Sequence, residues 1–128
     1  MIKKDPLMSK ELVVDRKASS NNPGFLFAAT QGAQLVLEGL TLTGGHASWV
    51  GNIASDGTGS LITLNFCIIR NNKGDVAAVC GFSGGSFVLN SCELYDNTAF
   101  NRGNALYISG GGSAALNSCT LRGNKAEI

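Results

Sequence analysis

The chain has 128 residues, of which 15% are charged and 44% are hydrophobic, and its formal net charge is +1. This length suits one domain, the apolar content excludes a disordered tail, and the small net charge gives no basis for binding nucleic acid. No apolar run approaches the roughly 18 residues that a transmembrane helix needs. Helix-forming residues are scarce whereas Gly is abundant, with 17 copies, and this composition favours short strands and tight turns.

Residues 1–17 form a charged leader in front of a weakly charged body. Eight charged residues fall within this segment, beginning with Lys3 and Lys4. No apolar stretch follows these two lysines, so we predict no secretory signal peptide. We expect residues 1–17 to be a leader that caps the N-terminal end of a single β-helix domain formed by residues 18–128.

The body contains an internal repeat, and repeats of this length decide a fold. Four segments align without gaps and start 27, 25 and 27 residues apart. They read LEGLTLTGG, LNFCIIRNN, LNSCELYDN and LNSCTLRGN. Equivalent residues form three uniform columns, which are Leu37, Leu64, Leu89 and Leu116; Cys67, Cys92 and Cys119; and Asn72, Asn97 and Asn124.

Each repeat contains about three short strands. Apolar residues alternate within the aligned segments, which is the pattern of a strand, and another short apolar stretch precedes each segment, at residues 25–28, 53–55, 77–80 and 105–108. One such unit cannot bury its apolar face alone, but it can stack on its neighbours at the inter-strand spacing of about 4.8 Å. We therefore predict an all-β fold, a short parallel β-helix (β-solenoid) of triangular section with about four coils and a period of 25–27 residues.

Polar and small residues recur at the predicted corners. We expect Asn72, Asn97 and Asn124 to occupy a turn, where Asn tolerates left-handed backbone and its amide can bond to the amide of the next coil. A second Asn column consists of Asn65, Asn90 and Asn117. Glycines cluster at a further corner, in residues 57–59, 84–85 and 110–112, where Gly allows positive φ without steric cost.

Two motifs carry a family resemblance. Residues 103–106 (GNAL) match a GGAI-like motif, and residues 69–72, 94–97 and 121–124 match an FxxN-like motif with Ile or Leu in place of Phe. Between residues 24 and 124 the chain therefore resembles the right-handed parallel β-helix, or pectin-lyase-like, superfamily, and most closely the repeats of chlamydial polymorphic outer membrane proteins. The resemblance implies a right-handed winding of the coils and a cell-surface location.

The chemistry-bearing residues do not form a catalytic group. The acidic residues of the body are scattered, at Glu38, Asp56, Asp75, Glu93 and Asp96. Enzymes of the resembled fold carry charged side chains on the outer face of one strand ladder, whereas the positions expected to point outward here are uncharged: Ile53, Ala78 and Ala105, and Ser55, Cys80 and Tyr107. The lone His46 has no triad partners, and we place it in a surface loop. We predict no enzymatic activity, no cofactor and no metal site, since Asp56 with Asp75 would give only a weak cation site.

The cysteine column predicts buried free thiols. Neighbouring coils hold equivalent residues about 4.8 Å apart, whereas a disulfide needs Cβ atoms about 3.5–4.5 Å apart, and a straight column does not converge on a zinc ion. Free thiols favour a reducing compartment, but the family resemblance implies the cell surface. The localisation stays open.

Trp49, Phe100 and Arg102 are candidate partner-binding residues. They lie in the longer inter-coil loops, residues 46–51 and 98–103, and we expect them to converge over the shorter loop at residues 73–75. Trp and Arg are enriched in binding hot spots. The alternative is that the aromatic rings cover a corner of the core, and both interpretations remain open.

The two ends of a solenoid expose strand edges, which invite pairing with other chains. The leader can cover one end, but only residues 125–128 follow the last repeat. We therefore expect a fragment, an oligomer or a subunit whose C-terminal end is covered by a protein partner. The predicted function is a non-catalytic structural or protein-interaction module in a larger assembly. The alternatives are a cell-surface adhesin or carbohydrate-binding fragment, and a degenerate polysaccharide lyase.

Overall fold

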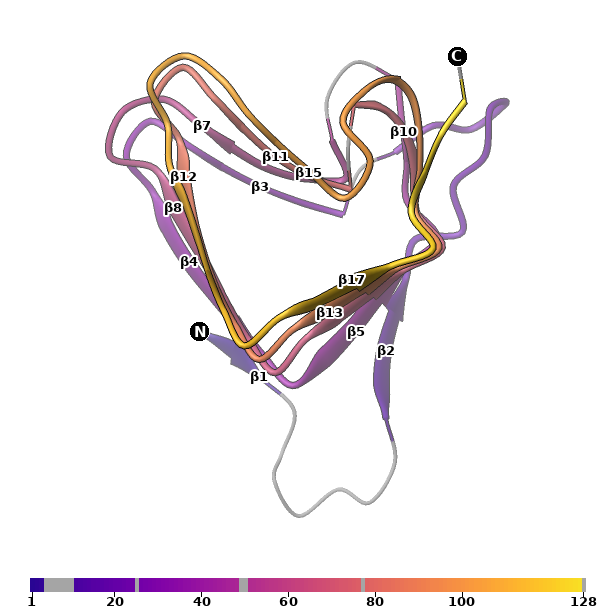
Figure 1. Ribbon diagram of the computed structural model, residues 1–128, viewed down its shortest axis with the longest axis horizontal. Coiled ribbons are helices and arrows are strands. Elements are labelled where there is room, and N and C mark those ends of the chain that lie inside the picture. The colour runs from indigo at the N-terminus through magenta and orange to yellow at the C-terminus, as the bar shows by residue number, and fades with distance from the viewer. Residues whose placement is uncertain (4–10, 25, 49–50, 77, 128) are drawn as a thin grey trace.

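A computed structural model describes residues 1–3, 11–24, 26–48, 51–76 and 78–127 of the chain. Within these ranges every regular element is a strand, so no described helix could cross a membrane. The strands wind into a parallel β-solenoid of about four turns with a period of about 27 residues. Figure 1 looks along the axis of this solenoid, with the last coil (yellow) nearest the viewer and β1 and β2 at the back. The predicted fold class is confirmed.

Each full coil contributes one strand to each of four sheets, which we name A to D. Sheet A comprises β1 (Ile2–Lys3), β4 (Gln34–Glu38), β8 (Leu61–Asn65), β12 (Ser86–Asn90) and β16 (Ala114–Asn117). Sheet B comprises β2 (Leu12–Asp15), β5 (Leu40–Thr43), β9 (Ile68–Arg70), β13 (Glu93–Tyr95) and β17 (Thr120–Arg122). Sheet C comprises β6 (His46–Ala47), β10 (Lys73–Val76), β14 (Thr98–Arg102) and β18 (Lys125–Ala126). Sheet D comprises β3 (Phe27–Thr30), β7 (Ile53–Asp56), β11 (Val79–Phe82) and β15 (Leu106–Ile108).

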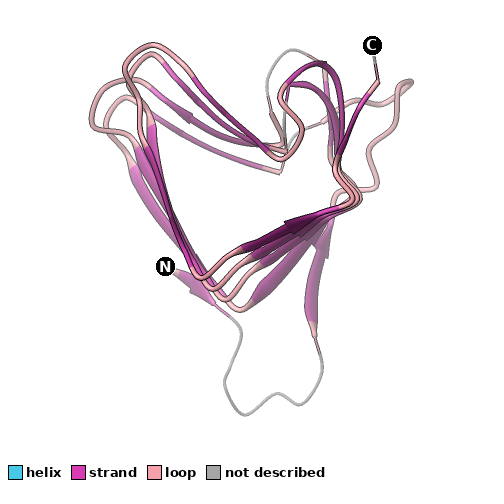
Figure 2. Ribbon diagram, viewed as in Figure 1, coloured by secondary structure: helices cyan, strands magenta, loops and turns pink. Residues whose placement is uncertain are grey.

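The prediction of three strands per coil and a triangular section is wrong, because sheet C lies where we expected inter-coil loops (Figure 2). The buried residues in one register column of sheet C are Ala47, Gly74 and Ala99. These side chains are too small to produce the alternation of large apolar and polar residues by which a strand is recognised in a sequence.

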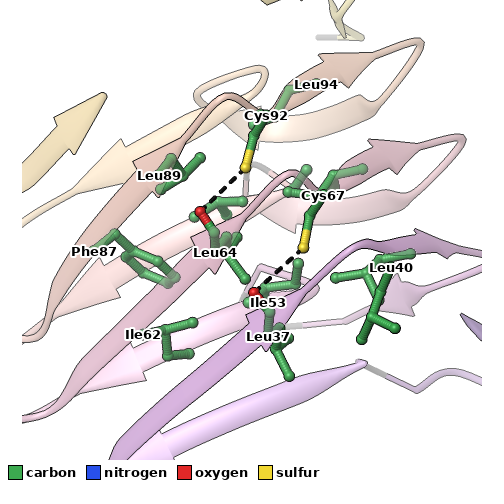
Figure 3. Close-up of a cluster of buried hydrophobic side chains, with 14 of the residues drawn as sticks. Leu37, Leu40, Ile53, Ile62, Leu64, Cys67, Phe87, Leu89, Cys92 and Leu94 are labelled. Atoms are coloured by element: carbon green, nitrogen blue, oxygen red, sulfur yellow. Dashed lines mark hydrogen bonds between the residues drawn. The ribbon is translucent and has the colours of Figure 1, made fainter. Parts of the chain in front are cut away.

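Sheets A and B provide most of the core. The register pairs Leu37 with Leu64, Leu89 and Leu116 along sheet A, and Leu42 with Ile69, Leu94 and Leu121 along sheet B. The cysteine column lies at the corner between these two sheets. Figure 3 shows the thiols of Cys67 and Cys92 pointing to the carbonyl oxygens of Leu37 and Leu64 in the preceding coil, with Sγ–O distances of 3.5 and 3.3 Å.

The corners depend on left-handed backbone, but not at the predicted asparagines. At the corner between sheets B and C the residues with positive φ are Gly44, Asn71, Asp96 and Gly123. Each of them directly precedes a member of the Asn column, or Gly45 in the first coil. The expectation that Asn72, Asn97 and Asn124 adopt left-handed backbone is therefore wrong. Their side-chain amides, described below, explain why Asn occupies that column.

The expected outward positions of sheet D are wrong at four of the six residues, Ile53, Ala78, Ala105 and Ser55. Ile53, Ala78 and Ala105 are buried in the main core, and Ile53 pairs with Val79, which in turn pairs with Leu106. Ser55 is buried and pairs with Gly81, which in turn pairs with Ile108. The opposite face carries Ala54, Cys80 and Tyr107, which pack with Val76 and Phe82 in a second small apolar cluster. Because both faces of the sheet are apolar, alternation alone could not distinguish inside from outside, and a register error of one residue moves a side chain to the other face.

Candidate docking site at the C-terminal end

The N-terminal end of the solenoid is covered by the beginning of the chain. Strand β1 pairs with β4, and β2 pairs with β5, so both lie on the first coil. Leu12 and Val14 of β2 pack against the main core. The segment after β2 continues the cover, because the N–H groups of Ala18 and Gly24 donate to the carbonyls of Gly44 and His46 at 2.8 and 2.9 Å. The first coil therefore has polypeptide over parts of three of its sheets.

The C-terminal end is different, because the core columns finish at the surface. Leu116 and Leu121 are 37% and 45% exposed, whereas Leu89 and Leu94, one coil earlier, are fully buried. The strands β15, β16, β17 and β18 are the outermost members of their sheets. A hollow opens beside them and is lined by residues 103–106 and 121–124. This end of the described structure is an exposed cross-section of the core.

The Asn column at the corner between sheets B and C links each coil to the next. Asn97 is fully buried, and its Oδ1 accepts hydrogen bonds from the backbone N–H and the Nδ2 of Asn72, both at 3.1 Å. Its Nδ2 donates to the carbonyl of Ile69 at 3.0 Å and to Oδ1 of Asn124 at 2.9 Å. All four hydrogen-bonding positions of this side-chain amide are thus used. Such satisfaction is what makes a buried amide tolerable in an apolar core.

The column has a direction, because each Asn contacts the coils before and after it through different atoms. Towards the preceding coil, Asn124 accepts from Asn97 through Oδ1 and donates to the carbonyl of Leu94 at 2.9 Å. Towards the following coil, Asn72 and Asn97 each use the backbone N–H and the second Nδ2 hydrogen. Asn124 carries the same two donors, and within the described part of the chain neither has an acceptor. The open end therefore presents two hydrogen-bond donors.

At the covered end the column is terminated. Gly45 takes the Asn position in the first coil, and its N–H donates to Oδ1 of Asn72 at 3.0 Å. Because Gly has no side chain, it needs neither a donor nor an acceptor from an earlier coil. Gly45 is buried, and a Cβ atom there would clash with the side-chain amide of Asn52. The difference between Gly45 and the three asparagines is the sequence signal by which this terminus could have been recognised.

A second amide column lies at the corner between sheets A and B. Nδ2 of Asn90 donates to Oδ1 of Asn65 at 2.8 Å, and Nδ2 of Asn117 donates to Oδ1 of Asn90 at 2.7 Å. In the first coil Glu38 pairs with Asn65, so this column also begins with a residue other than Asn. Asn117 is its last and exposed member. The last coil therefore ends both columns with an amide.

The cysteines differ according to their distance from the open end. Cys67 and Cys92 are buried, whereas Cys119 is partly exposed, and all the cysteines are free. Hydrogen bonding to Cys67, together with burial, raises the pKa of the Cys92 thiol. Burial also raises the pKa of Cys80, to about 12, although the N–H of Gly51 points at its Sγ from 2.9 Å. The thiols of Cys80 and Cys92 therefore stay protonated at neutral pH and are inert, because the thiolate is the reactive form.

The predicted cluster of Trp49, Phe100 and Arg102 is only partly visible. Trp49 lies outside the described residues. Phe100 is 37% exposed in β14, and its ring lies 5.8 Å from that of His46, which belongs to strand β6 and not to a loop. The guanidinium of Arg102 lies 3.4 Å from the hydroxyl of Tyr107. Among the described residues, the ring nearest to Phe100 across strand β10 is thus that of His46, which we had predicted to lie in a surface loop and had not assigned to this cluster.

The acidic residues do not gather. Glu38, Asp56, Asp75 and Glu93 lie on sheets A, D, C and B respectively. Within the described ranges no three His, Cys, Asp or Glu side chains are grouped to hold a metal ion.

Comparison of the chain with protein-family models, with curated proteins and with solved structures found no match.

Proposed function

We propose that this protein is a non-catalytic structural and protein-interaction module whose C-terminal end packs against a partner polypeptide. One observation carries the proposal: Leu116 and Leu121 are 37% and 45% exposed at the ends of columns that are fully buried one coil earlier. Burying apolar surface contributes about 25 cal/mol per Å². A partner that covers these side chains would therefore gain the same stabilisation that each coil gives the coil before it.

The strand edges support the same function. The free edges of β15 to β18 carry backbone N–H and C=O groups that an added strand can pair with. Strand addition combines such backbone hydrogen bonds with side-chain pockets that give specificity. Here the exposed core columns and the hollow lined by residues 103–106 and 121–124 would receive the side chains of an added coil.

Two alternative functions have less support from the arrangement of the side chains. Glycoside cleavage commonly needs two carboxylates on either side of one bond, whereas the four acidic residues that lie in strands of the body occupy four different sheets. Carbohydrate binding favours free aromatic faces, and Phe66 is 66% exposed. The other rings have neighbours: the Arg122 guanidinium lies 4.0 Å from the centroid of the Tyr95 ring, and the rings of Phe82 and Tyr107 lie 6.0 Å apart. An adhesin is the second candidate function, because the FxxN-like motif in the repeats of this chain resembles the repeat motif of surface proteins.

We also infer that the chain is a right-handed member of the pectin-lyase-like superfamily, close to the chlamydial outer membrane protein repeats. The support is the recurrence of the FxxN-like motif in three successive coils, at residues 69–72, 94–97 and 121–124. In each copy the final Asn belongs to the amide column between sheets B and C.

The capacity of the C-terminal end to receive a coil can be tested with an extended chain, in which residues 127–128 are replaced by a copy of residues 100–124. The copied Cys119 is replaced by Ser, so that alkylation of the native Cys119 reports whether the end is covered. We expect alkylation to slow by about tenfold or more, and the Tm to rise by a few degrees (about 4 °C per kcal/mol).

The matched control carries the same added residues in scrambled order. An ordered copy that protects Cys119 no better than the scrambled copy, and that leaves the Tm unchanged, would show that the exposed end does not accept a coil. In that case the proposed function would be rejected.

A further inference from the structure

The two amide columns point to the chemistry of the partner. We propose that the C-terminal end selects a parallel β-coil that brings an Asn carboxamide onto Asn124 and a second one onto Asn117. This inference rests on the proposed function, which says only that a polypeptide covers the end. It adds what that polypeptide must carry.

The first requirement comes from Asn124. Oδ1 of Asn97 and Oδ1 of Asn124 each accept two hydrogen bonds, one from the backbone N–H and one from the Nδ2 of the Asn one coil earlier, at distances of 2.9 to 3.1 Å. The Asn that accepts these bonds also donates its Nδ2 to a backbone carbonyl of the coil before it. Asn97 donates to the carbonyl of Ile69, and Asn124 donates to the carbonyl of Leu94. The partner must therefore supply one acceptor atom for Asn124 and one donor atom for the carbonyl of Leu121.

Among side chains of this reach, only the Asn carboxamide carries an acceptor oxygen and a donor nitrogen on two separate atoms. An Asp carboxylate cannot donate to the Leu121 carbonyl, and a Ser hydroxyl places donor and acceptor on one atom. Asn117 adds the second requirement, because Asn65, Asn90 and Asn117 already pair amide to amide. The partner sequence is thus expected to contain two asparagines seven residues apart, as in Asn90 and Asn97, with an apolar residue three positions before the second.

The N-terminal end of a second copy of this chain does not meet these requirements. At the two column positions its first coil carries Glu38 and Gly45, so it offers no carboxamide. In addition, β1 and β2 already lie on that coil. The occupant is therefore a parallel coil that carries the two asparagines and not the N-terminal end of another copy of this chain.

The test substitutes single residues in the appended coil of the extended chain described above. Replacing the copied Asn124 by Leu, or the copied Asn117 by Leu, removes one carboxamide while the four native coils keep their own sequence. The matched control replaces the copied Asn101, which lies outside both columns and is exposed in the native chain. We expect each column variant to be alkylated at Cys119 about tenfold faster than the unsubstituted extended chain, and the Asn101 control to be unchanged.

Each outcome separates the two proposals. If the Leu variants protect Cys119 as well as the Asn coil does, the amide requirement is wrong although the end still accepts a coil. If even the unsubstituted coil fails to protect Cys119, the proposed function itself fails. Light scattering of the unextended chain supplies the remaining readout: open-ended polymers that grow with concentration would identify a second copy as the occupant and would overturn the inference.

Discussion

The two ends of this solenoid are built from the same repeat but are finished in different ways. At the N-terminal end, β1 and β2 lie across the first coil, and both amide columns begin with residues other than Asn, namely Glu38 and Gly45. At the C-terminal end, both columns finish with asparagines, and the apolar columns finish with exposed leucines. The difference shows that an amide column gives a solenoid a direction, because every Asn depends on atoms of the coil that follows.

Exposed strand edges are a hazard for a protein, and natural solenoids cap them. In this chain the cap on the first coil is largely apolar at its contact, because Leu12 and Val14 pack on the core. An equivalent contact at the other end would have to cover Leu116 and Leu121.

The largest difference is expected between two members of one amide column. The substitution Asn97→Leu leaves the Ile69 carbonyl and the two Asn72 donors unpaired and removes one of the two donors to Oδ1 of Asn124, so we expect it to lower the free energy of unfolding by about 4 kcal/mol or more. Asn124→Leu also removes the partner of the Leu94 carbonyl and of two Asn97 donors, but Asn124 is only partly buried at the open end, so its loss should be smaller, about 2 kcal/mol. Urea denaturation measures both values. Equal losses would show that the end of the column does not differ from its middle.

A smaller difference is expected along one apolar column of sheet B, which runs from Val14 through Leu42, Ile69 and Leu94 to Leu121. Leu94→Ala creates a cavity in the buried core and should cost about 3 kcal/mol. Val14→Ala, in strand β2 of the leader, should cost about 1 kcal/mol, and Leu121→Ala, which is 45% exposed, should cost less than Val14→Ala. If Leu121→Ala were as costly as Leu94→Ala, the C-terminal end would already be closed.

A pH-dependent loss is expected from the interior thiol Cys80. Burial raises its pKa from 9.0 to about 12. Above pH 9 the unfolded chain therefore releases a proton that the folded chain keeps, and stability falls as the pH rises towards 12. Between pH 9 and about pH 10.5 this linkage should remove about 2 kcal/mol.

The variant Cys80→Ala should show a flatter pH profile than the native chain over the same range. Unfolding curves at several pH values make the comparison. Parallel profiles for the native chain and Cys80→Ala would remove Cys80 as the cause.

The smallest effect on stability is expected for modification at the open end. Cys119 is partly exposed, whereas Cys67, Cys80 and Cys92 are buried, so iodoacetamide should alkylate Cys119 about tenfold faster or more. Because Cys119 is only partly buried and lies in the last coil, the Tm should change by only about 1 °C. Mass spectrometry after partial labelling identifies the modified residue. Equal labelling of Cys92 would show that the last coil opens freely.

The amino-acid sequence by itself determined the repeat and therefore the fold. Leu37, Leu64, Leu89 and Leu116 could be aligned because stacking places equivalent residues in one register, so side chains that share a column share an environment. The alignment of the repeats also identified the Cys and Asn columns, because their members occupy equivalent positions. It also drew attention to the C-terminal end, because a repeat that cannot bury its core alone leaves an apolar face wherever stacking stops.

Only the tertiary structure decided which atoms the columns use. Sheet C was missed because Ala47, Gly74 and Ala99 are too small to alternate visibly. Four residues in or next to sheet D, including Ile53 and Ser55, were assigned to the wrong face because both faces are apolar. The direction of the Asn column depends on bonds between Asn72, Asn97 and Asn124, which are 25 and 27 residues apart. A sequence shows that these residues are alike, but which coil each amide donates to is set by the three-dimensional position of its neighbours.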